Sequence, residues 1–157
     1  MNLEIERKFL LKDDSWKNSA AEFHEFRQSY FSSGNGPAIR IRIADSDAYL
    51  TIKSPSKGIS RAEFEYKIPL ADAELMLKLF CGSEIVKRRW IVPYENFSWE
   101  IDEFHGANEG LVVAEIELAS AEQQFPIPPW LGQEVSTDLR YRNSHLLKNP
   151  YSLWKDK

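Results

Sequence analysis

Cysteine is almost absent from the 157-residue sequence, which has Cys81 as its single thiol. One cysteine cannot form an internal disulfide or a thiolate zinc site, and no nucleophile motif surrounds it, so we expect a small buried side chain. Long apolar runs are absent too, since stretches such as residues 111–114 are far shorter than the roughly 20 residues of a membrane span. Glu4 and Glu6 stand where a signal peptide would carry basic and then apolar residues. These absences predict a cytoplasmic protein with no part in a membrane.

Positive charge is not in excess either, because 20 Lys and Arg residues are outnumbered by 24 Asp and Glu residues, which gives a net charge of −4. This balance argues against bulk attraction to nucleic acid or to an anionic membrane. Any polyanion must therefore be bound locally, by a basic cluster inside an acidic protein.

Glycine and proline are few, with 7 and 8 residues, and they are scattered singly except in residues 33–37 and 126–129. We expect these two segments to be turns or loops, and no stretch resembles an interdomain linker. With 43% hydrophobic residues, the chain has enough apolar mass for a real core. We therefore expect residues 1–157 to form a single domain.

Apolar and polar residues alternate with period two in several segments, which is typical of half-buried strands. The pattern predicts eight strands, at about residues 2–11, 24–32, 37–45, 47–54, 60–68, 84–93, 96–104 and 111–119. Eight strands in a chain of this length predict an antiparallel sheet or barrel. The fold class is therefore α+β and mainly antiparallel β.

A few segments break this period and predict helices around the sheet. Residues 70–80 read as an amphipathic helix, because acidic residues occupy its first turn and its apolar residues follow a helical repeat. The apolar residues are Leu70, Ala73, Leu77 and Phe80. Shorter helices are expected at residues 13–21 and 119–124, and in the tail after residue 138.

Charged or polar residues recur two positions apart in seven of the predicted strands. They are Glu4, Glu6 and Lys8; Arg40 and Arg42; Thr51 and Lys53; Arg61, Glu63 and Glu65; Lys87 and Arg89; Glu100 and Asp102; and Glu115 and Glu117. Any single set could be the solvated face of a sheet, since antiparallel sheets commonly have one wet face. Like charges two residues apart repel each other, however, so their recurrence indicates a function. If the strands close into a barrel with the apolar residues outward, all of these charges point into the lumen.

Such a lumen would hold eight carboxylates and seven cationic side chains. Carboxylates crowded on one wall cannot all stay ionised without a cation, and their oxygens are the ligands that Mg²⁺ and Mn²⁺ prefer. Guanidinium and ammonium groups are the natural partners of phosphate oxygens. The combination predicts a site for a polyphosphate chain with a divalent metal.

Residues 4–8, Glu-Ile-Glu-Arg-Lys, match the ExExK signature of the CYTH superfamily, whose members are also called triphosphate tunnel metalloenzymes. The resemblance continues in family order through the other charged sets and includes residues 134–143, so it spans nearly the whole chain. It implies a closed eight-stranded antiparallel β-barrel tunnel with peripheral helices. The start of the chain, through Phe9, is most similar to the short bacterial inorganic triphosphatases.

The resemblance also implies roles for the charged residues. The expected metal ligands, for one or two Mg²⁺ or Mn²⁺ ions, are Glu4, Glu6, Glu63, Glu65, Glu100, Asp102, Glu115 and Glu117. The expected substrate-binding residues are Lys8, Arg40, Arg42, Lys53, Arg61, Lys87 and Arg89. Lys8, Lys87 and Glu117 are the candidate catalytic residues. In the last segment Arg140, Arg142 and Lys148 all compete for a role in closing the tunnel.

The expected activity is metal-dependent hydrolysis of inorganic triphosphate or a related triphosphate. A carboxylate-bound metal can activate water while basic residues hold the phosphates, so no nucleophilic serine or cysteine is required. The alternatives are an adenylyl cyclase or thiamine triphosphatase of the same superfamily, or a non-catalytic polyphosphate- or nucleotide-binding module. A binding module would not need a complete acidic wall, so the presence of every carboxylate pair favours an enzyme. The expected partner is a triphosphate-containing small molecule, and the chain is a monomer or a homodimer.

Several other residues that attract attention are expected to be structural. His24, His105 and His145 lie in unrelated segments without the spacing of metal ligands. Arg7 and Arg88 face away from their charged neighbours, so we place them on the surface. The five tryptophans are expected to pack the outer face of the strands against helices.

Overall fold

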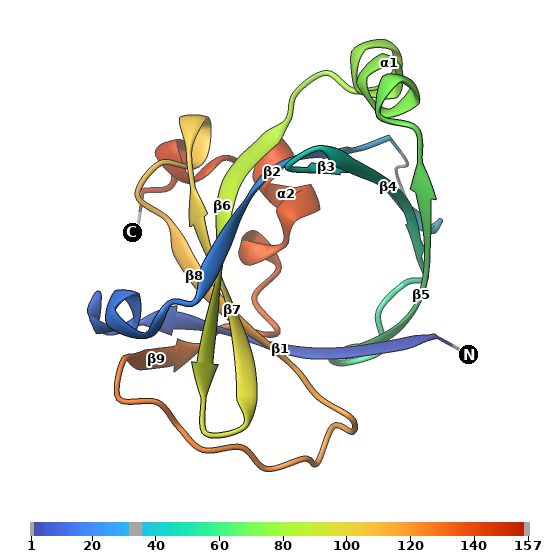
Figure 1. Cartoon of the computed structure of the whole chain (residues 1–157). Helices are drawn as coiled ribbons and strands as arrows, with labels where there is room; N and C mark the ends of the chain where they lie inside the picture. Colours follow the sequence, from blue (N-terminus) through green and yellow to red (C-terminus); the bar gives the residue numbers. More distant parts are fainter. Residues whose placement is uncertain (1, 32–35, 156–157) are drawn as a thin grey trace.

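The computed structural model describes residues 2–31 and 36–155, and its strands form one antiparallel sheet that closes into a barrel (Figure 1). The strands are β1 (Leu3–Leu11), β2 (Glu22–Tyr30), β3 (Ala38–Ala44), β4 (Asp47–Lys53), β5 (Ser60–Ile68), β6 (Ile85–Tyr94), β7 (Phe97–Phe104), β8 (Val112–Glu117) and β9 (Leu131–Glu134). Their order in the sheet is β5-β4-β3-β2-β6-β7-β8-β1-β9, and β5 also pairs with β1. The predicted closed eight-stranded barrel is therefore confirmed, with β9 as an additional strand.

The barrel closes through β1, whose two edges have different neighbours. One edge pairs with β8 between Glu6 and Phe9. The other edge is shared, since Leu3–Ile5 pair with β5 while Phe9 and Leu11 pair with β9. The first part of this edge thus pairs with β5, and the last part pairs with β9.

The eight predicted strands are all present, with ends that differ from the prediction by up to two residues. The short strand β9 was missed, because it has four residues and follows a proline-rich loop, so no alternation is visible. The expected helix at residues 119–124 is wrong. There the side chain of Gln123 accepts a hydrogen bond from the Ala119 amide, and the segment forms turns. Of the turn expected at residues 33–37, residues 33–35 lie outside the described part of the chain.

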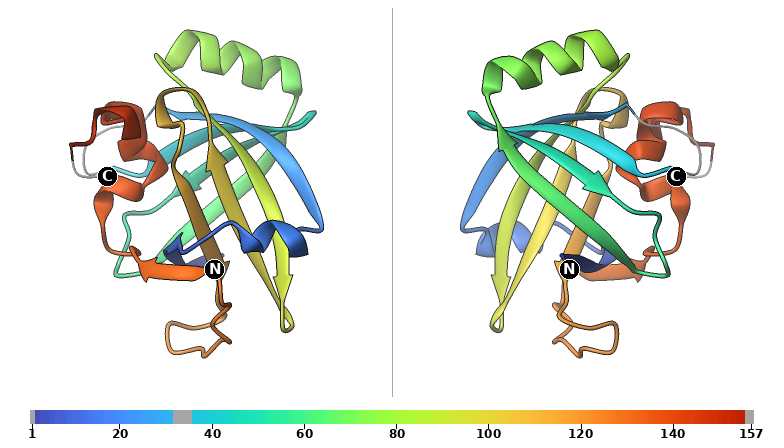
Figure 2. Two further views of the ribbon diagram at one scale, coloured as in Figure 1. Left: turned by 90° about the vertical axis from the view of Figure 1, so that its left-hand side faces the viewer. Right: turned by 90° about the vertical axis from the view of Figure 1, so that its right-hand side faces the viewer.

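The helices lie around the barrel as expected, except that those of the tail cover the apolar end of its lumen. They are η1 (Ser15–Ser19), α1 (Leu70–Phe80), η2 (Gly106–Asn108), η3 (Leu139–Tyr141), α2 (Asn143–Lys148) and η4 (Tyr151–Leu153). Helix α1 packs against β3 and β4 at one end of the barrel, opposite the loop at residues 118–130 (Figure 2). It buries Ala73 and Leu77, but Leu70 and Phe80 are 41% and 58% exposed, so only part of its predicted apolar face is used.

The largest core cluster covers the outer face of β1, β6, β7 and β8 and includes Phe9, Ile101 and Ile116. Trp99 and Trp130 meet there with ring centroids 5.5 Å apart, and Trp16 is fully buried in the same cluster. Trp16, Trp90, Trp99 and Trp130 therefore pack the outer face as predicted, whereas Trp154 belongs to a second cluster. The covering layer, however, includes the irregular segment before β9 rather than helices alone.

A second core cluster lies on the inner face, at one end of the barrel. Ile85, Phe104 and Val113 are two residues before or after the charged residues of β6, β7 and β8, so they share the inward face. The tail (residues 136–155) docks on them through Tyr141, Leu146 and Trp154. This end of the lumen is thus apolar and is occupied by the tail, which leaves the charged part as the open cavity. No helix in the described ranges is long and apolar enough to cross a membrane.

Candidate active site

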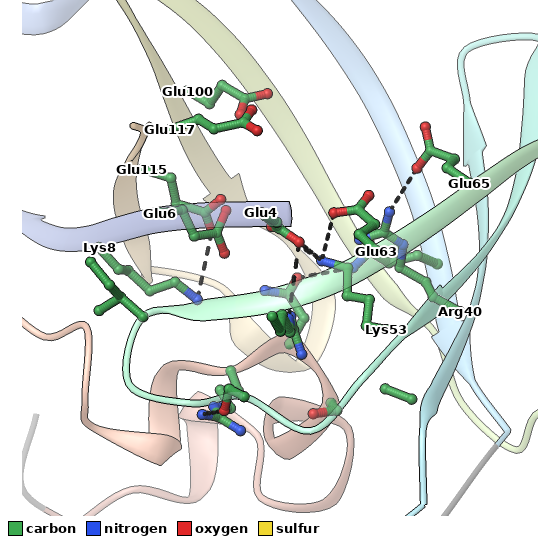
Figure 3. A pocket seen from close by; sticks show the side chains of 18 of the residues that line it. Glu4, Glu6, Lys8, Arg40, Lys53, Glu63, Glu65, Glu100, Glu115 and Glu117 are labelled. Atoms are coloured by element: carbon green, nitrogen blue, oxygen red, sulfur yellow. Dashed lines mark hydrogen bonds and ion pairs between the residues drawn. The ribbon is translucent and has the colours of Figure 1, made fainter. Parts of the chain in front are cut away.

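A cavity of about 440 Å³ occupies the charged part of the lumen (Figure 3). Strands present alternate side chains to one face, so the period-two pattern places the charged sets on the inner wall. Every expected metal-binding or substrate-binding residue lines this cavity except Asp102. The cavity also receives residues that the sequence did not single out, among them Gln28, Tyr30 and Asn143.

One wall of the cavity is acidic and is built by β1, β7 and β8. Glu6 is the register partner of Glu117, and Glu100 is the register partner of Glu115. Figure 3 shows these four side chains gathered on one side of the cavity, beside Glu4. Burial, followed by repulsion from Glu4, raises the pKa of both Glu6 and Glu117 above the usual carboxylate value. The wall therefore carries more negative charge than its surroundings neutralise.

This wall fits a hard divalent cation by the chemistry of its donors. All of the donors are carboxylate oxygens, and a bound cation would relieve the repulsion between them. In the described ranges no three such side chains already stand in metal-binding geometry. Mg²⁺ usually keeps several of its waters and needs only one or two carboxylates, so the wall meets its requirements without a tighter cluster.

The acidic and basic walls meet at Lys53 and at Lys8. The Lys53 ammonium lies 2.9 Å from an oxygen of Glu4 and 3.8 Å from one of Glu63. The Lys8 ammonium lies 3.5 Å from Glu115 and donates to the backbone carbonyl of Tyr141 at 3.1 Å. Both cations therefore stand at the boundary between the two walls.

Arg40 anchors the basic wall opposite. Its guanidinium donates to Thr51 Oγ1 at 3.1 Å and to Glu65 Oε2 at 3.2 Å. Its Nε–H is buried and has no acceptor among the residues of the described chain. One donor of this side chain is thus left for a ligand.

Asp102 lies behind the wall and is 0% exposed. Its carboxylate accepts two hydrogen bonds from Arg89, at 2.7 and 2.9 Å, and one from Lys87 at 2.6 Å. Burial alone would raise the pKa of Asp102, but these two cations overcome that effect and hold the pKa well below its usual range. Burial lowers the pKa of Lys87 to about 7, against the attraction of Asp102.

Arg42 is held differently, by uncharged groups. Its Nε–H donates to Gln28 Oε1 at 2.7 Å, and its guanidinium lies 4.5 Å from the centre of the Phe26 ring. No carboxylate of the described residues lies within ion-pair distance of it. Burial, with further repulsion from Arg40 and Arg89, lowers the pKa of Arg42 to about 9. The charge of Arg42 is thus not compensated by a carboxylate of the described residues.

Of the three tail cations considered, Arg142 lines the cavity and donates to Ser56 Oγ at 2.6 Å. Arg140 instead pairs with Asp138 outside it. Lys148 does not line the cavity, and neither does any histidine. On the outer surface Arg7 pairs with Glu134, and Arg88 pairs with Glu25, as expected for residues that face away from the lumen.

Comparison with protein families matches residues 2–149 to the CYTH domain. An inorganic triphosphatase from Acetivibrio thermocellus is 43% identical over 157 residues, which cover 99% of this chain and all of that protein. An inorganic triphosphatase from Nitrosomonas europaea is 32% identical over 147 residues, with 91% and 95% of the two chains covered.

Solved structures show the same arrangement of strands. A crystal structure of an inorganic triphosphatase superposes with a TM-score of 0.66 at 29% identity, and the match covers 94% of this chain and 95% of the other. A structure described as a putative adenylyl cyclase from Hippeastrum with a dominant triphosphatase activity superposes with a TM-score of 0.55. At 15% identity, that second likeness concerns the fold alone.

Proposed function

The chain belongs to the CYTH domain family, and on this premise we propose that it hydrolyses inorganic triphosphate inside its barrel in a metal-dependent reaction. The observation that carries the proposal is the division of one cavity inside the closed barrel into an acidic wall and a basic wall. The two curated relatives and one solved structure carry the name inorganic triphosphatase, which agrees with this chemistry.

In this proposal the basic wall holds the phosphates in line. Arg40 has a buried donor that no described residue accepts from, Arg42 pairs with no described carboxylate, and Lys53 and Arg89 extend the wall on both sides. Arg61 and Lys87 also face the cavity. Positioning and electrostatic stabilisation are the main work of phosphoryl-transfer enzymes, so a cationic cradle of this kind is what the reaction requires.

The acidic wall would hold Mg²⁺ or Mn²⁺. Glu6, Glu100, Glu115 and Glu117 are the ligands we propose first, with Glu4, Glu63 and Glu65 nearby. When bound, the metal supplies positive charge to phosphate oxygens and lowers the pKa of a water molecule. Asp102 already uses both oxygens on Arg89 and Lys87, so we propose that it orients these cations.

Three residues stay our candidates for the chemical step. Glu117 lies on the acidic wall, where its carboxylate can accept a proton from the attacking water. Lys8 and Lys87 can neutralise charge that develops on the leaving phosphate. The position of Lys8 beside Glu115 places it next to the proposed metal.

Inorganic triphosphate suits the cavity better than a nucleotide or thiamine triphosphate. Tyr30 is the one aromatic side chain among the described lining residues, and the tail fills one end of the lumen. An adenine or thiamine ring would therefore find Tyr30 as its single aromatic partner among the described lining residues. Inorganic triphosphate needs only charge and hydrogen-bond donors.

The test is phosphate release from triphosphate, pyrophosphate, ATP and thiamine triphosphate, with Mg²⁺ and Mn²⁺ in turn and a parallel assay for cyclic AMP. Protein treated with chelator should be inactive and should recover with added metal. We expect triphosphate to be the preferred substrate and no cyclic AMP to form. Full turnover without metal, or binding of triphosphate without hydrolysis, would overturn the proposal. A cytoplasmic location and a monomeric or dimeric state stay predictions from the sequence.

A further inference from the structure

Two neutral amide side chains, those of Gln28 and Asn143, connect the cations of the cavity. Gln28 Oε1 accepts from Arg42 Nε at 2.7 Å, and Gln28 Nε2 donates to Asn143 Oδ1 at 3.1 Å. The same Asn143 oxygen accepts from Lys87 Nζ at 3.0 Å. The chain of hydrogen bonds therefore runs from β3 through β2 to the first residue of α2 and on to β6.

The direction of these hydrogen bonds is fixed at both ends. Arg42 and Lys87 can only donate, so each must meet an amide oxygen. If either amide were turned over, its NH₂ group would face a cation. Gln28 is 0% exposed, so water cannot replace the lost partners. The two amides therefore have one satisfied arrangement, and it holds both cations in place.

The neutrality of these acceptors sets them apart from the other partners of the basic wall. Arg40, Lys53 and Arg89 each lie within ion-pair distance of a carboxylate. A carboxylate orients a cation but also neutralises it, whereas an amide oxygen orients the cation and leaves its full charge. Gln28 thus orients the Arg42 guanidinium without weakening the attraction between Arg42 and a bound anion.

We propose that Gln28 and Asn143 are positioning residues for triphosphate, which hold Arg42 and Lys87 toward the phosphates, and that Gln28 does so without neutralising Arg42. This inference rests on the proposed function. It gives the tail a part in the site, because Asn143 belongs to α2 and not to the barrel. Arg42, which pairs with no carboxylate of the described residues, is then the cation of the basic wall most in need of an anionic partner.

The decisive variant is Gln28→Glu, which keeps the size and the acceptor for Arg42 but adds a negative charge beside Arg42 and removes the donor to Asn143. A purely structural role predicts a lower melting temperature from the lost donor, with kcat/KM for triphosphate retained. Our proposal predicts a kinetic defect as well. We expect kcat/KM for triphosphate to fall at least about tenfold, mainly through KM.

Gln124→Glu is the matched control, since it makes the same chemical change at an exposed position in the loop outside the barrel. It should leave the kinetics unchanged. Gln28→Glu should also lose most of its effect in an Arg42→Ala background, because Gln28 acts through Arg42. A kcat/KM for Gln28→Glu within about threefold of the wild type would overturn the proposal.

If Gln28→Glu does not fold, Asn143→Asp decides by the same criterion, because Asn143 lies at the cavity surface. Calorimetric titration with triphosphate separates this proposal from the proposed activity. A wild type that binds triphosphate but does not hydrolyse it would refute only the activity. Equal affinities of the wild type and Gln28→Glu would refute only the positioning role.

Discussion

Replacement of Arg40 by alanine distinguishes a substrate-binding residue from a structural ion pair. The Arg40 side chain is buried, and its partner Glu65 keeps 40% of its side chain exposed. Because water can still reach the unpaired Glu65, loss of this ion pair should cost only about 1 kcal/mol of folding stability. For a chain of this length, that corresponds to about 2–4 °C in melting temperature.

The expected effect on substrate is much larger. The buried Nε–H of Arg40 has no acceptor within the described chain, so we assign it to a phosphate oxygen. A charged hydrogen bond lost from a partly dry cavity costs about 2–4 kcal/mol, or roughly 30-fold to 700-fold in kcat/KM.

The assay is phosphate release and thermal melting of Arg40→Ala, each with and without triphosphate. Arg88→Ala is the control, because it removes an arginine from a carboxylate pair on the outer face of β6 and should leave the kinetics unchanged. Unchanged kinetics of Arg40→Ala together with a lowered melting temperature would refute the reasoning.

Three further predictions follow from the site and the surface. Glu117→Gln should lower kcat by at least about a hundredfold, since it removes a proposed metal ligand, and melting should show equal or greater stability because like-charge repulsion is relieved. Asp102→Asn should lower the melting temperature by roughly 10 °C, because a buried charge pair broken on one side costs about 3–5 kcal/mol; a stable variant that has lost metal binding would contradict the orienting role. The hydrogen bond from His24 to Asp45 raises the pKa of His24. The contribution of this hydrogen bond to folding stability is therefore fully present below about pH 6.5 and is lost as pH rises through the folded-state pKa of His24. The difference in urea midpoint between the wild type and His24→Gln should therefore be larger at about pH 5.5 than at about pH 8.5, and a pH-independent difference would count against it.

The sequence predicted the wall of the cavity well because strand geometry makes it readable. Side chains two residues apart share a face, so each charged set had to point to one side of the sheet. The same rule also carries information that we did not use. Ile85 lies two residues before Lys87, and Val113 lies two residues before Glu115, so each shares the inward face of its strand. The change from a charged to an apolar lining was therefore already visible in the sequence.

The features that could not be predicted depend on contacts between residues that are far apart in the sequence. One edge of β1 pairs with β5 in its first part and with β9 in its last part. The four residues of β9 contain no local pattern that predicts its pairing with β1. Gln28 and Asn143 carry no charge and stand 115 positions apart, so their contact has no sequence signal. Asp102 follows the same alternation as Glu100, and only the placement of Arg89 and Lys87 separates it from the cavity.

The closure of the barrel through β1 has a consequence for the order of events during synthesis. β1 is synthesised before the other described strands, but its neighbours β8 and β9 come about a hundred residues or more later in the chain. Pairings so distant in sequence make folding slow, because the loop must close before the contacts stabilise it. Until β8 emerges, Glu6 has no Glu117 opposite it and the acidic wall does not exist. The proposed metal site can therefore form only after β8 has been synthesised.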